Sequence, residues 1–244
     1  MASSTSQRER STIPTGFHER AFTMKGLSAK TLSAAAALSL AALGSTGAQA
    51  AGVEILNEGF NNVGGLGGWT QVNASVPAGS AWFQGNDGLF PAQAGPADSY
   101  AAASFLGAAN GSGNVDNWLI TPTLDLSGAT LLNFYTRTTG EPGFNDYLEV
   151  RLSTGGSDPA DFTTLLTTIG NTGGYPSDWA GFSIALEADG PARFAFRYLG
   201  SADSLSYVGL DTVSVVTAVP EPSTWMMLAM GLGGLGLLRR RQQS

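Results

Sequence analysis

The segment Arg193-Phe194-Ala195-Phe196-Arg197-Tyr198 places an aromatic side chain at every second residue. Successive side chains of a β-strand point to opposite faces of its sheet. We therefore expect Phe194, Phe196 and Tyr198 to face a core, and both arginines to face outward. This segment predicts a strand of a half-buried sheet rather than a turn of helix.

A second segment, Tyr147-Leu148-Glu149-Val150-Arg151-Leu152, has the same period. Its apolar residues Leu148, Val150 and Leu152 fall on one side, and Tyr147, Glu149 and Arg151 fall on the other. Two such segments, more than forty residues apart, indicate strands that share a core across long connections.

Further short runs rich in aromatic and β-branched residues alternate with segments rich in Gly, Ser, Thr and Asn. This composition is typical of β-proteins. Together the runs predict an all-β, jelly-roll-type two-sheet sandwich with no helix inside the domain. The expected strands are 53–60, 69–72, 81–84, 99–106, 118–124, 130–138, 147–153, 163–169, 180–185, 193–199 and 208–216.

The charge of the expected domain, residues 51–218, is strongly acidic. It contains 16 acidic residues and 4 basic ones, a formal charge of −12, and no lysine. Such a surface repels nucleic acid and anionic lipid, so we expect no nucleic-acid partner. It is suited to solubility and to divalent cations.

Cysteine is absent from the chain, and the one histidine, His18, precedes the expected domain. The domain therefore has no ligands for a Cys or His zinc site, no Ser-His-Asp triad and no Cys-His pair. Without disulfides, an exported domain has to be held by its core or by a metal with oxygen ligands.

The N-terminal segment predicts export. Residues 1–23 are polar and basic without periodicity, and we interpret them as sequence upstream of the true start at Met24. Residues 24–50 then form a signal peptide: Lys25 and Lys30 are positively charged, residues 32–43 are apolar, and Ala48-Gln49-Ala50 is a small-x-small cleavage site. The expected partners at this stage are the Sec translocon and signal peptidase.

The C-terminal segment, residues 219–244, has three parts in a fixed order. Pro220-Glu221-Pro222 is stiff and lacks two backbone donors, residues 225–238 are apolar and uncharged, and Arg239-Arg240-Arg241 is a positive membrane stop. The apolar run of 14 residues is short against the roughly 20 that span a bilayer. Its glycines also weaken a permanent helix, so a removable apolar helix is favoured over an ordinary membrane anchor.

This order of motif, apolar run and basic end resembles the PEP-CTERM sorting signal. The resemblance implies recognition by an exosortase, a membrane enzyme that cuts near Pro-Glu-Pro. It also implies transient anchoring in the inner membrane of a Gram-negative bacterium, followed by delivery to the cell surface or extracellular matrix.

Within the domain, the most distinctive string is Asp116-Asn117-Trp118-Leu119-Ile120-Thr121-Pro122-Thr123-Leu124-Asp125-Leu126. With Asn57-Glu58-Gly59-Phe60, Gly68-Trp69-Thr70 and Gly209-Leu210-Asp211-Thr212-Val213, it resembles the choice-of-anchor J family. That family is related to the cleaved-adhesin and MAM-like jelly-roll domains. The chain departs from the family pattern at Asp211-Thr212, where an acidic pair is common.

The residues of this string also have a physical interpretation. Trp118, Leu119 and Ile120 predict a buried strand, and Pro122 predicts its end at an edge or bend. Asp116 precedes the buried part, where a carboxylate caps a turn. The alternative is a structural calcium site formed by Glu58, Asp116 and Asp211, because calcium prefers hard oxygen ligands.

Two further groups of side chains are candidates for carbohydrate chemistry. Glu141, Asp146 and Glu149 are close in sequence, and a glycosidase needs two carboxyl groups at a defined separation. Exposed aromatic side chains stack on sugar rings, although aromatic residues more often anchor cores or loops; the candidates are Trp69, Trp82, Tyr175 and Trp179.

The sequence therefore favours an exported, non-enzymatic protein of the cell surface or extracellular matrix. Its expected role is adhesion, binding, or a structural association with exopolysaccharide. The alternative is a carbohydrate-binding module, or a glycoside-active enzyme that uses carboxylates. No catalytic residue is assigned.

Overall fold

The computed structural model describes residues 52–171, 174–218 and Met230. The upstream segment 1–23, the signal peptide 24–50 and the sorting tail 219–244, with Pro220-Glu221-Pro222 and Arg239-Arg240-Arg241, lie outside the described residues, apart from Met230. Within the described part of the chain, no helix has the length and apolarity needed to cross a membrane.

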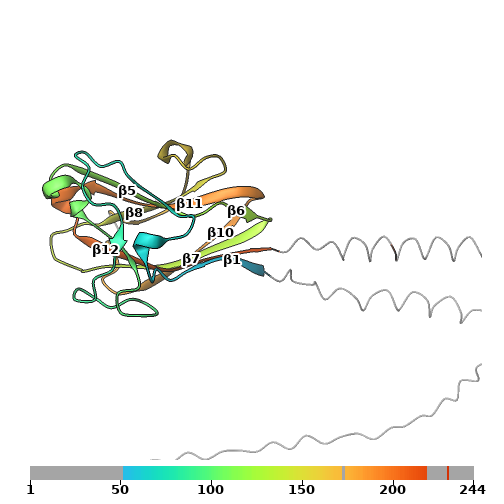
Figure 1. Ribbon diagram of the computed structural model, residues 1–244, viewed down its shortest axis with the longest axis horizontal. Coiled ribbons are helices and arrows are strands. Elements are labelled where there is room, and N and C mark those ends of the chain that lie inside the picture. Colours follow the sequence, from blue (N-terminus) through green and yellow to red (C-terminus); the bar gives the residue numbers. More distant parts are fainter. Residues whose placement is uncertain (1–51, 172–173, 219–229, 231–244) are drawn as a thin grey trace, which may run out of the picture. The chain divides into compact units, whose positions relative to one another are not determined.

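The described domain is a sandwich of two six-stranded sheets (Figure 1). Sheet A has the order β10-β7-β12-β4-β3, and β1 also pairs with β12. Its strands are β1 (Gly52–Glu58), β3 (Phe83–Gln84), β4 (Ala101–Ser104), β7 (Ala129–Thr138), β10 (Ala180–Glu187) and β12 (Tyr207–Ala218).

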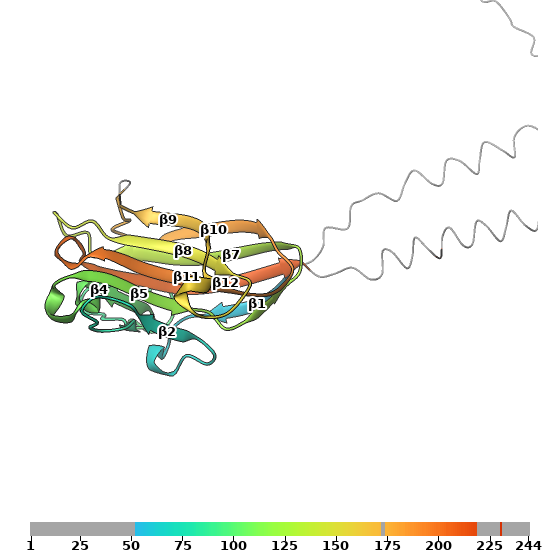
Figure 2. The same ribbon diagram turned by 90° about the horizontal axis from the view of Figure 1, so that it is seen from above.

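Sheet B has the order β2-β5-β11-β8-β9, and β6 also pairs with β11. Its strands are β2 (Thr70–Asn73), β5 (Asn114–Ile120), β6 (Leu124–Leu126), β8 (Tyr147–Ser153), β9 (Thr164–Gly170) and β11 (Gly190–Ser201). The view onto the sheets in Figure 2 shows β9 and β10 along one side of the sandwich and β2 on the other. All these pairings are antiparallel.

Within the sandwich, residues 52–171 and 174–218, the helices are short 3-10 turns in the connections. They are η1 (Val63–Gly65), η2 (Phe105–Gly107), η3 (Ala109–Gly111), η4 (Pro159–Asp161) and η5 (Ala202–Ser204). The prediction of an all-β sandwich is confirmed.

The core lies between the sheets and contains the residues that the alternation predicted. Phe194, Phe196 and Tyr198 of β11 are fully buried. Phe196 contacts Phe134 of β7 edge to face, with ring centroids 5.2 Å apart. Burying a side chain of this size contributes about 1.5–3 kcal/mol, so the aromatic residues of β11 hold the two sheets together.

Most predicted strands lie within one to three residues of the observed bounds. The exception is 118–124, which is two strands: β5 ends at Ile120 and β6 begins at Leu124. Pro122 lies between them and has no backbone donor for a ladder, so the predicted break is confirmed. Both strands pair with β11, at different positions along its length.

A smaller aromatic cluster covers one end of the outer face of sheet A. Ala102 and Tyr207 alternate with core residues of β4 and β12, so they point away from the main core. They pack with Phe90 and Tyr100, which flank the connection between β3 and β4. The connection between β3 and β4 also covers Asp211 of β12, through hydrogen bonds from the backbone N–H groups of Gln93 and Ala94.

Candidate functional site

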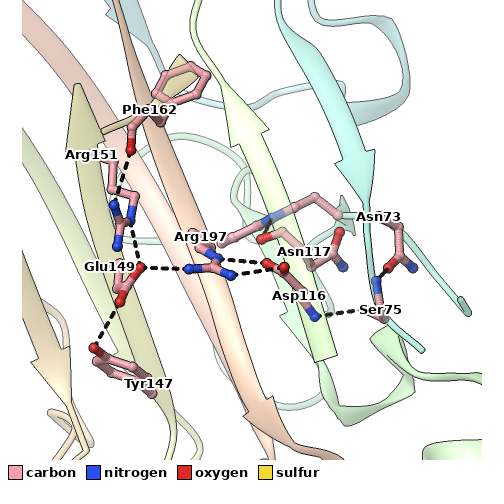
Figure 3. A network of polar contacts seen from close by, with 10 residues as sticks. Asn73, Ser75, Asp116, Asn117, Tyr147, Glu149, Arg151, Phe162 and Arg197 are labelled. Carbon is pink, nitrogen blue, oxygen red and sulfur yellow. Dashed lines mark hydrogen bonds and ion pairs between the residues drawn. The ribbon is translucent and has the colours of Figure 1, made fainter. Parts of the chain in front are cut away.

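A chain of charged side chains crosses the outer face of sheet B (Figure 3). We call Asp116, Arg197, Glu149 and Arg151 the arginine network; they lie on β5, β11 and β8. Arg197 donates from Nε and Nη2 to the two carboxylate oxygens of Asp116 at 2.7 and 2.9 Å. Its Nη1 donates to Oε2 of Glu149 at 3.2 Å. One guanidinium therefore joins carboxylates from two neighbouring strands.

Further hydrogen bonds extend the network at its β8 end. Arg151 Nε donates to Oε2 of Glu149 at 2.7 Å, and its Nη1 donates to the carbonyl of Phe162 at 3.0 Å. Tyr147 donates its hydroxyl to Oε1 of Glu149 at 3.0 Å. Both oxygens of Glu149 are thus engaged, and its side chain is only 8% exposed.

The electrostatics of the network keep Glu149 and Arg197 charged. Burial raises the pKa of Glu149, but hydrogen bonds from Arg151, Tyr147 and Arg197 outweigh it, so this pKa lies below its ordinary value. Hydrogen bonding to Asp116 raises the pKa of Arg197. A general acid needs a carboxyl whose pKa is raised, so Glu149 is unsuited to that role.

Arg197 also covers a buried tryptophan. Its guanidinium carbon lies 4.7 Å from the ring centroid of Trp118, which packs with Ile120, Ala195 and Phe162 on the outer face of sheet B. Trp118 Nε1 is buried without a hydrogen-bond partner. The outward orientation predicted for Arg197 is correct, but the arginine closes over an apolar patch instead of projecting into solvent.

Asp116 therefore has neither of the two roles considered from the sequence. It lies inside β5, not in a turn, and its carboxylate is bonded by Arg197. The turn-cap prediction is wrong because the strand begins earlier, at Asn114. The partner on β11 could not be identified from sequence, because the register of β5 against β11 sets it.

The other two predicted calcium ligands lie on sheet A. Glu58 ends β1 and accepts a hydrogen bond from the backbone N–H of Phe60. Asp211 is fully buried in β12 and accepts from the backbone N–H groups of Gln93, Ala94 and Thr212. Burial raises the pKa of Asp211.

Only two of the three predicted calcium ligands, Glu58 and Asp211, lie on neighbouring strands. Glu58 pairs with Val213, two residues from Asp211, whereas Asp116 lies on sheet B and is occupied by Arg197. Among the described residues, no three His, Cys, Asp or Glu side chains form a metal-sized group. The predicted set of three carboxylate ligands is therefore not assembled.

The carboxylates Glu141, Asp146 and Glu149 have separate roles. Glu141 is exposed on a turn, whereas Asp146 is 3% exposed. Asp146 accepts hydrogen bonds from Thr138, from the hydroxyl of Tyr198 at 2.5 Å and from the backbone N–H of Ser206 at 2.9 Å. It links the two sheets, and no catalytic pair results.

The aromatic candidates are anchors of the core and loops. Trp82 is 3% exposed, and its indole N–H donates to the carbonyl of Asn117. Trp69 packs edge to face on Phe60, and Tyr175 bonds Thr136 with its hydroxyl. Trp179 donates to the carbonyl of Pro91, so each of the four side chains has a structural contact.

The outer face of sheet A has a different composition, which the sequence reasoning did not identify. Ser183, Asn133, Ser214 and Asn57 lie side by side on β10, β7, β12 and β1, and we call them the polar row. The Ser183 hydroxyl donates to Oδ1 of Asn133 at 2.7 Å. Asn133 Nδ2 donates to Ser214 at 3.5 Å, which is long for a hydrogen bond.

The polar row has Tyr135 on one side and an apolar groove on the other. Tyr135 and Leu131 are each two residues from Asn133 along β7 and share its face. The groove has a volume of about 820 Å³ and is lined in part by Leu131, Ala185 and Val216. Strand alternation could have predicted which residues of each strand point to this outer face. Their alignment in one row is known only when the registers of the four strands are known.

Comparison with protein families gives two matches. The family model described as Cleaved Adhesin Domain matches residues 53–215, and the PEP-CTERM protein-sorting motif matches residues 218–242. No curated protein sequence matches the chain.

Two solved structures similar to the domain are cleaved adhesin domains of Lys-gingipain from Porphyromonas gingivalis W83. The K1 domain is 29% identical, with a TM-score of 0.53, and the alignment covers 68% of this chain and 98% of that one. The K3 domain is 24% identical, with a TM-score of 0.52, and the alignment covers 69% and 100% of the two chains.

Proposed function

Because the chain belongs to the Cleaved Adhesin Domain family, we propose that it is a non-enzymatic adhesin placed by an exosortase on the cell surface or in the extracellular matrix. The observation that supports this is the order of the two family matches. The adhesin domain ends at residue 215, and the sorting motif begins at residue 218. A binding domain followed directly by a sorting signal is suited to display outside the cell.

We also propose the path that the protein takes. The signal peptide directs export, the apolar tail anchors the protein transiently in the inner membrane of a Gram-negative bacterium, and cleavage near Pro220 releases the domain to the surface. The first and last residues of the sandwich, Gly52 and Ala218, pair with each other in sheet A.

The chemistry of the described carboxylates favours binding over catalysis. Glu149 and Asp116 are paired with arginines, and Asp146 is bonded by hydroxyl groups. Asp211, whose pKa is raised, is fully buried. A glycosidase needs one raised carboxyl and one ionised carboxyl that both face the substrate, and these residues do not supply such a pair.

The experiment is to locate the protein by fractionation in cells with and without the exosortase gene. We expect the protein in the surface or matrix fraction of wild-type cells, with an N-terminus after Ala50 and without residues 226–238 by mass spectrometry. Without the exosortase, it should remain in the membrane fraction and retain the tail.

A matched control replaces Pro220, Glu221 and Pro222 by alanine in cells that have the exosortase. This variant should reproduce the retention seen without the enzyme. A mature surface species that still contains residues 226–238 would contradict sorting and leave an ordinary anchor as the explanation.

A carbohydrate-binding module is the second candidate function. The observation that favours it is the uncharged polar row beside Tyr135, because neutral sugars are bound through amide and hydroxyl groups together with an aromatic face. This candidate is compatible with the adhesin proposal, since a matrix protein needs a ligand in the matrix.

A further inference from the structure

We propose that the outer face of sheet A binds a neutral polysaccharide chain through Tyr135, the polar row and the adjoining apolar groove. The inference rests on the proposed surface-binding function and adds to it the class of ligand and the residues that contact it. We call these three features together the sheet A platform.

Tyr135 supplies an aromatic side chain on the outer face of sheet A, next to Gly181 of the edge strand. A Cβ atom added to Gly181, its partner on β10, would lie 3.1 to 3.6 Å from the Tyr135 ring atoms Cε1, Cζ and Cδ1. The ring therefore leans over the bare backbone of Gly181. The Tyr135 side chain is half-buried, and in the proposal the apolar face of a sugar ring stacks on the part of the ring that solvent reaches.

The polar row supplies hydrogen bonds in a line. Neighbouring strands of a sheet are about 4.8 Å apart, so a linear glycan lying across β10, β7, β12 and β1 meets a new polar side chain at intervals comparable to one sugar unit. Asn133 is the central member, and its Nδ2 makes only a 3.5 Å hydrogen bond within the row. That donor can bond a sugar hydroxyl better than it bonds Ser214.

Charge restricts the ligand to a neutral one. Tyr135 and the four residues of the polar row are uncharged, while Glu187 lines the groove and Glu54 lies beside Asn57, to which it is hydrogen-bonded at 3.1 Å. The domain as a whole has a formal charge of −12. An anionic polymer would be repelled both by the rim and by the whole surface.

The strand at the side of the platform leaves it accessible. β10 is the edge strand of sheet A, and its outward residues next to the platform are Gly181, Ser183 and Ala185. These small side chains do not rise above the sheet. A long chain can therefore extend beyond the edge of the platform without a wall to end it, which suits a polymer better than a small molecule.

The test is affinity electrophoresis and pull-down of the exported protein with neutral and anionic polysaccharides. The neutral probes are amylose, xylan, a β-1,3-glucan and the neutral fraction of the producing organism's own matrix; polygalacturonate is the anionic probe. We expect binding to at least one neutral probe and none to polygalacturonate.

Two substitutions locate the site. Tyr135→Ala should weaken binding about tenfold, because it removes the stacking surface. Ser183→Asp should weaken it by a similar factor, because it places a charge in the row at an exposed edge position that tolerates substitution. The matched control is Phe144→Ala, which removes an aromatic side chain of 48% exposure in the connection between β7 and β8, outside the strands of sheet A, and should leave binding unchanged.

The outcomes separate this inference from the function on which it rests. Binding of a neutral probe that neither substitution weakens would overturn the platform while leaving the adhesin proposal standing. The platform would also be overturned if the protein bound polygalacturonate alone or bound no neutral probe. A change in the oligomeric state of the Ser183→Asp variant, measured by gel filtration, would overturn it as well. Localisation is measured separately by fractionation, so its failure would be recognised as failure of the proposed function.

Discussion

On the outer face of sheet B, each charged side chain of the arginine network contacts an opposite charge, whereas the polar row of sheet A has no charge and bonds itself weakly. Arg197 makes three hydrogen bonds to carboxylates, while Asn133 has one short and one long contact within its row. Both faces are polar, but the charged groups of the arginine network satisfy one another, whereas the side-chain amide of Asn133 in the polar row has hydrogen-bonding capacity left over.

The difference follows from the cost of burying charge. Glu149 is 8% exposed at its side chain, and an ionised carboxylate at such a position needs a partner and hydrogen bonds. Neutral amides and hydroxyls at half-buried or exposed positions have no such requirement. We infer that the outer face of sheet B contributes to stability and that the outer face of sheet A is available for ligands.

The largest expected effect comes from breaking the arginine network. Arg197→Ala leaves Glu149 with one guanidinium and Asp116 with none, and should lower the free energy of unfolding by about 3 kcal/mol. This is the lower end of the range for broken buried pairs, chosen because Arg197 and Asp116 are 24% and 26% exposed and are partly screened by solvent. Urea denaturation of the exported protein measures it.

The matched control is Arg193→Ala. Arg193 lies on the same strand and the same face as Arg197 and forms no ion pair within the described part of the chain. Its removal should change stability by less than about 0.5 kcal/mol. Equal losses in the two variants would show that the network has no special role.

The next largest expected effect is stabilisation by calcium, which should depend on Asp211 of sheet A and not on Asp116 of sheet B. The calcium proposal is left with Glu58 and Asp211, which lie on neighbouring strands of sheet A. Calcium bound there and present at 100 times its dissociation constant should stabilise the domain by about 2.7 kcal/mol, because a bound cation relieves the repulsion of a surface of charge −12. Asp211→Ala should abolish this increment. Asp116→Ala should retain it, because the Asp116 carboxylate is held by Arg197.

Thermal melting with calcium, with magnesium and with chelator measures the increment. Magnesium should stabilise less, because it requires stricter octahedral geometry. Asp158→Ala, at an exposed position before η4, is the control and should behave as wild type. If chelator leaves the melting curve unchanged, calcium has no structural role in this domain.

A smaller effect concerns pH. The pKa of Glu149 lies below its unfolded value near 4.5, so its contribution to stability is fully present above that value and is lost as pH falls through the folded pKa. Glu149→Gln should therefore lose less stability between pH 6 and pH 3 than wild type does. Denaturation midpoints at both pH values would measure this, and equal losses would contradict the role of Glu149.

The sequence was sufficient for the sandwich because strand alternation is local information. The inward positions of Phe194, Phe196 and Tyr198 follow from the alternation of their own strand. Pro122 interrupts the strand in any sheet, because it has no backbone N–H to donate. The family resemblance, drawn from separated motifs, was also confirmed over residues 53–215.

The site was less predictable because it depends on register between strands distant in sequence. Asp116 and Arg197 are 81 residues apart, and neither the turn-cap nor the calcium interpretation anticipated their pairing. Asn57 and Asn133, members of one row, lie on strands that meet only through β12. Alternation predicts on which face of the sheet a side chain lies, but it does not predict which residue of the adjacent strand lies beside it.

The smallest expected effect on stability is at the centre of the polar row. It tests whether the polar row, unlike the arginine network, contributes little to stability. Asn133 is half-buried, its nitrogen bonds Ser214 at 3.5 Å, and Ser183, which donates to its oxygen, is exposed to solvent. Asn133→Ala should therefore change the free energy of unfolding by less than about 0.5 kcal/mol, while it removes the central donor for a bound glycan. Urea denaturation and affinity electrophoresis of the same preparation measure both quantities. A loss of stability as large as that of Arg197→Ala would mean that the row, like the arginine network, is a structural bond between strands, and that the outer face of sheet A has no hydrogen-bonding capacity reserved for a ligand.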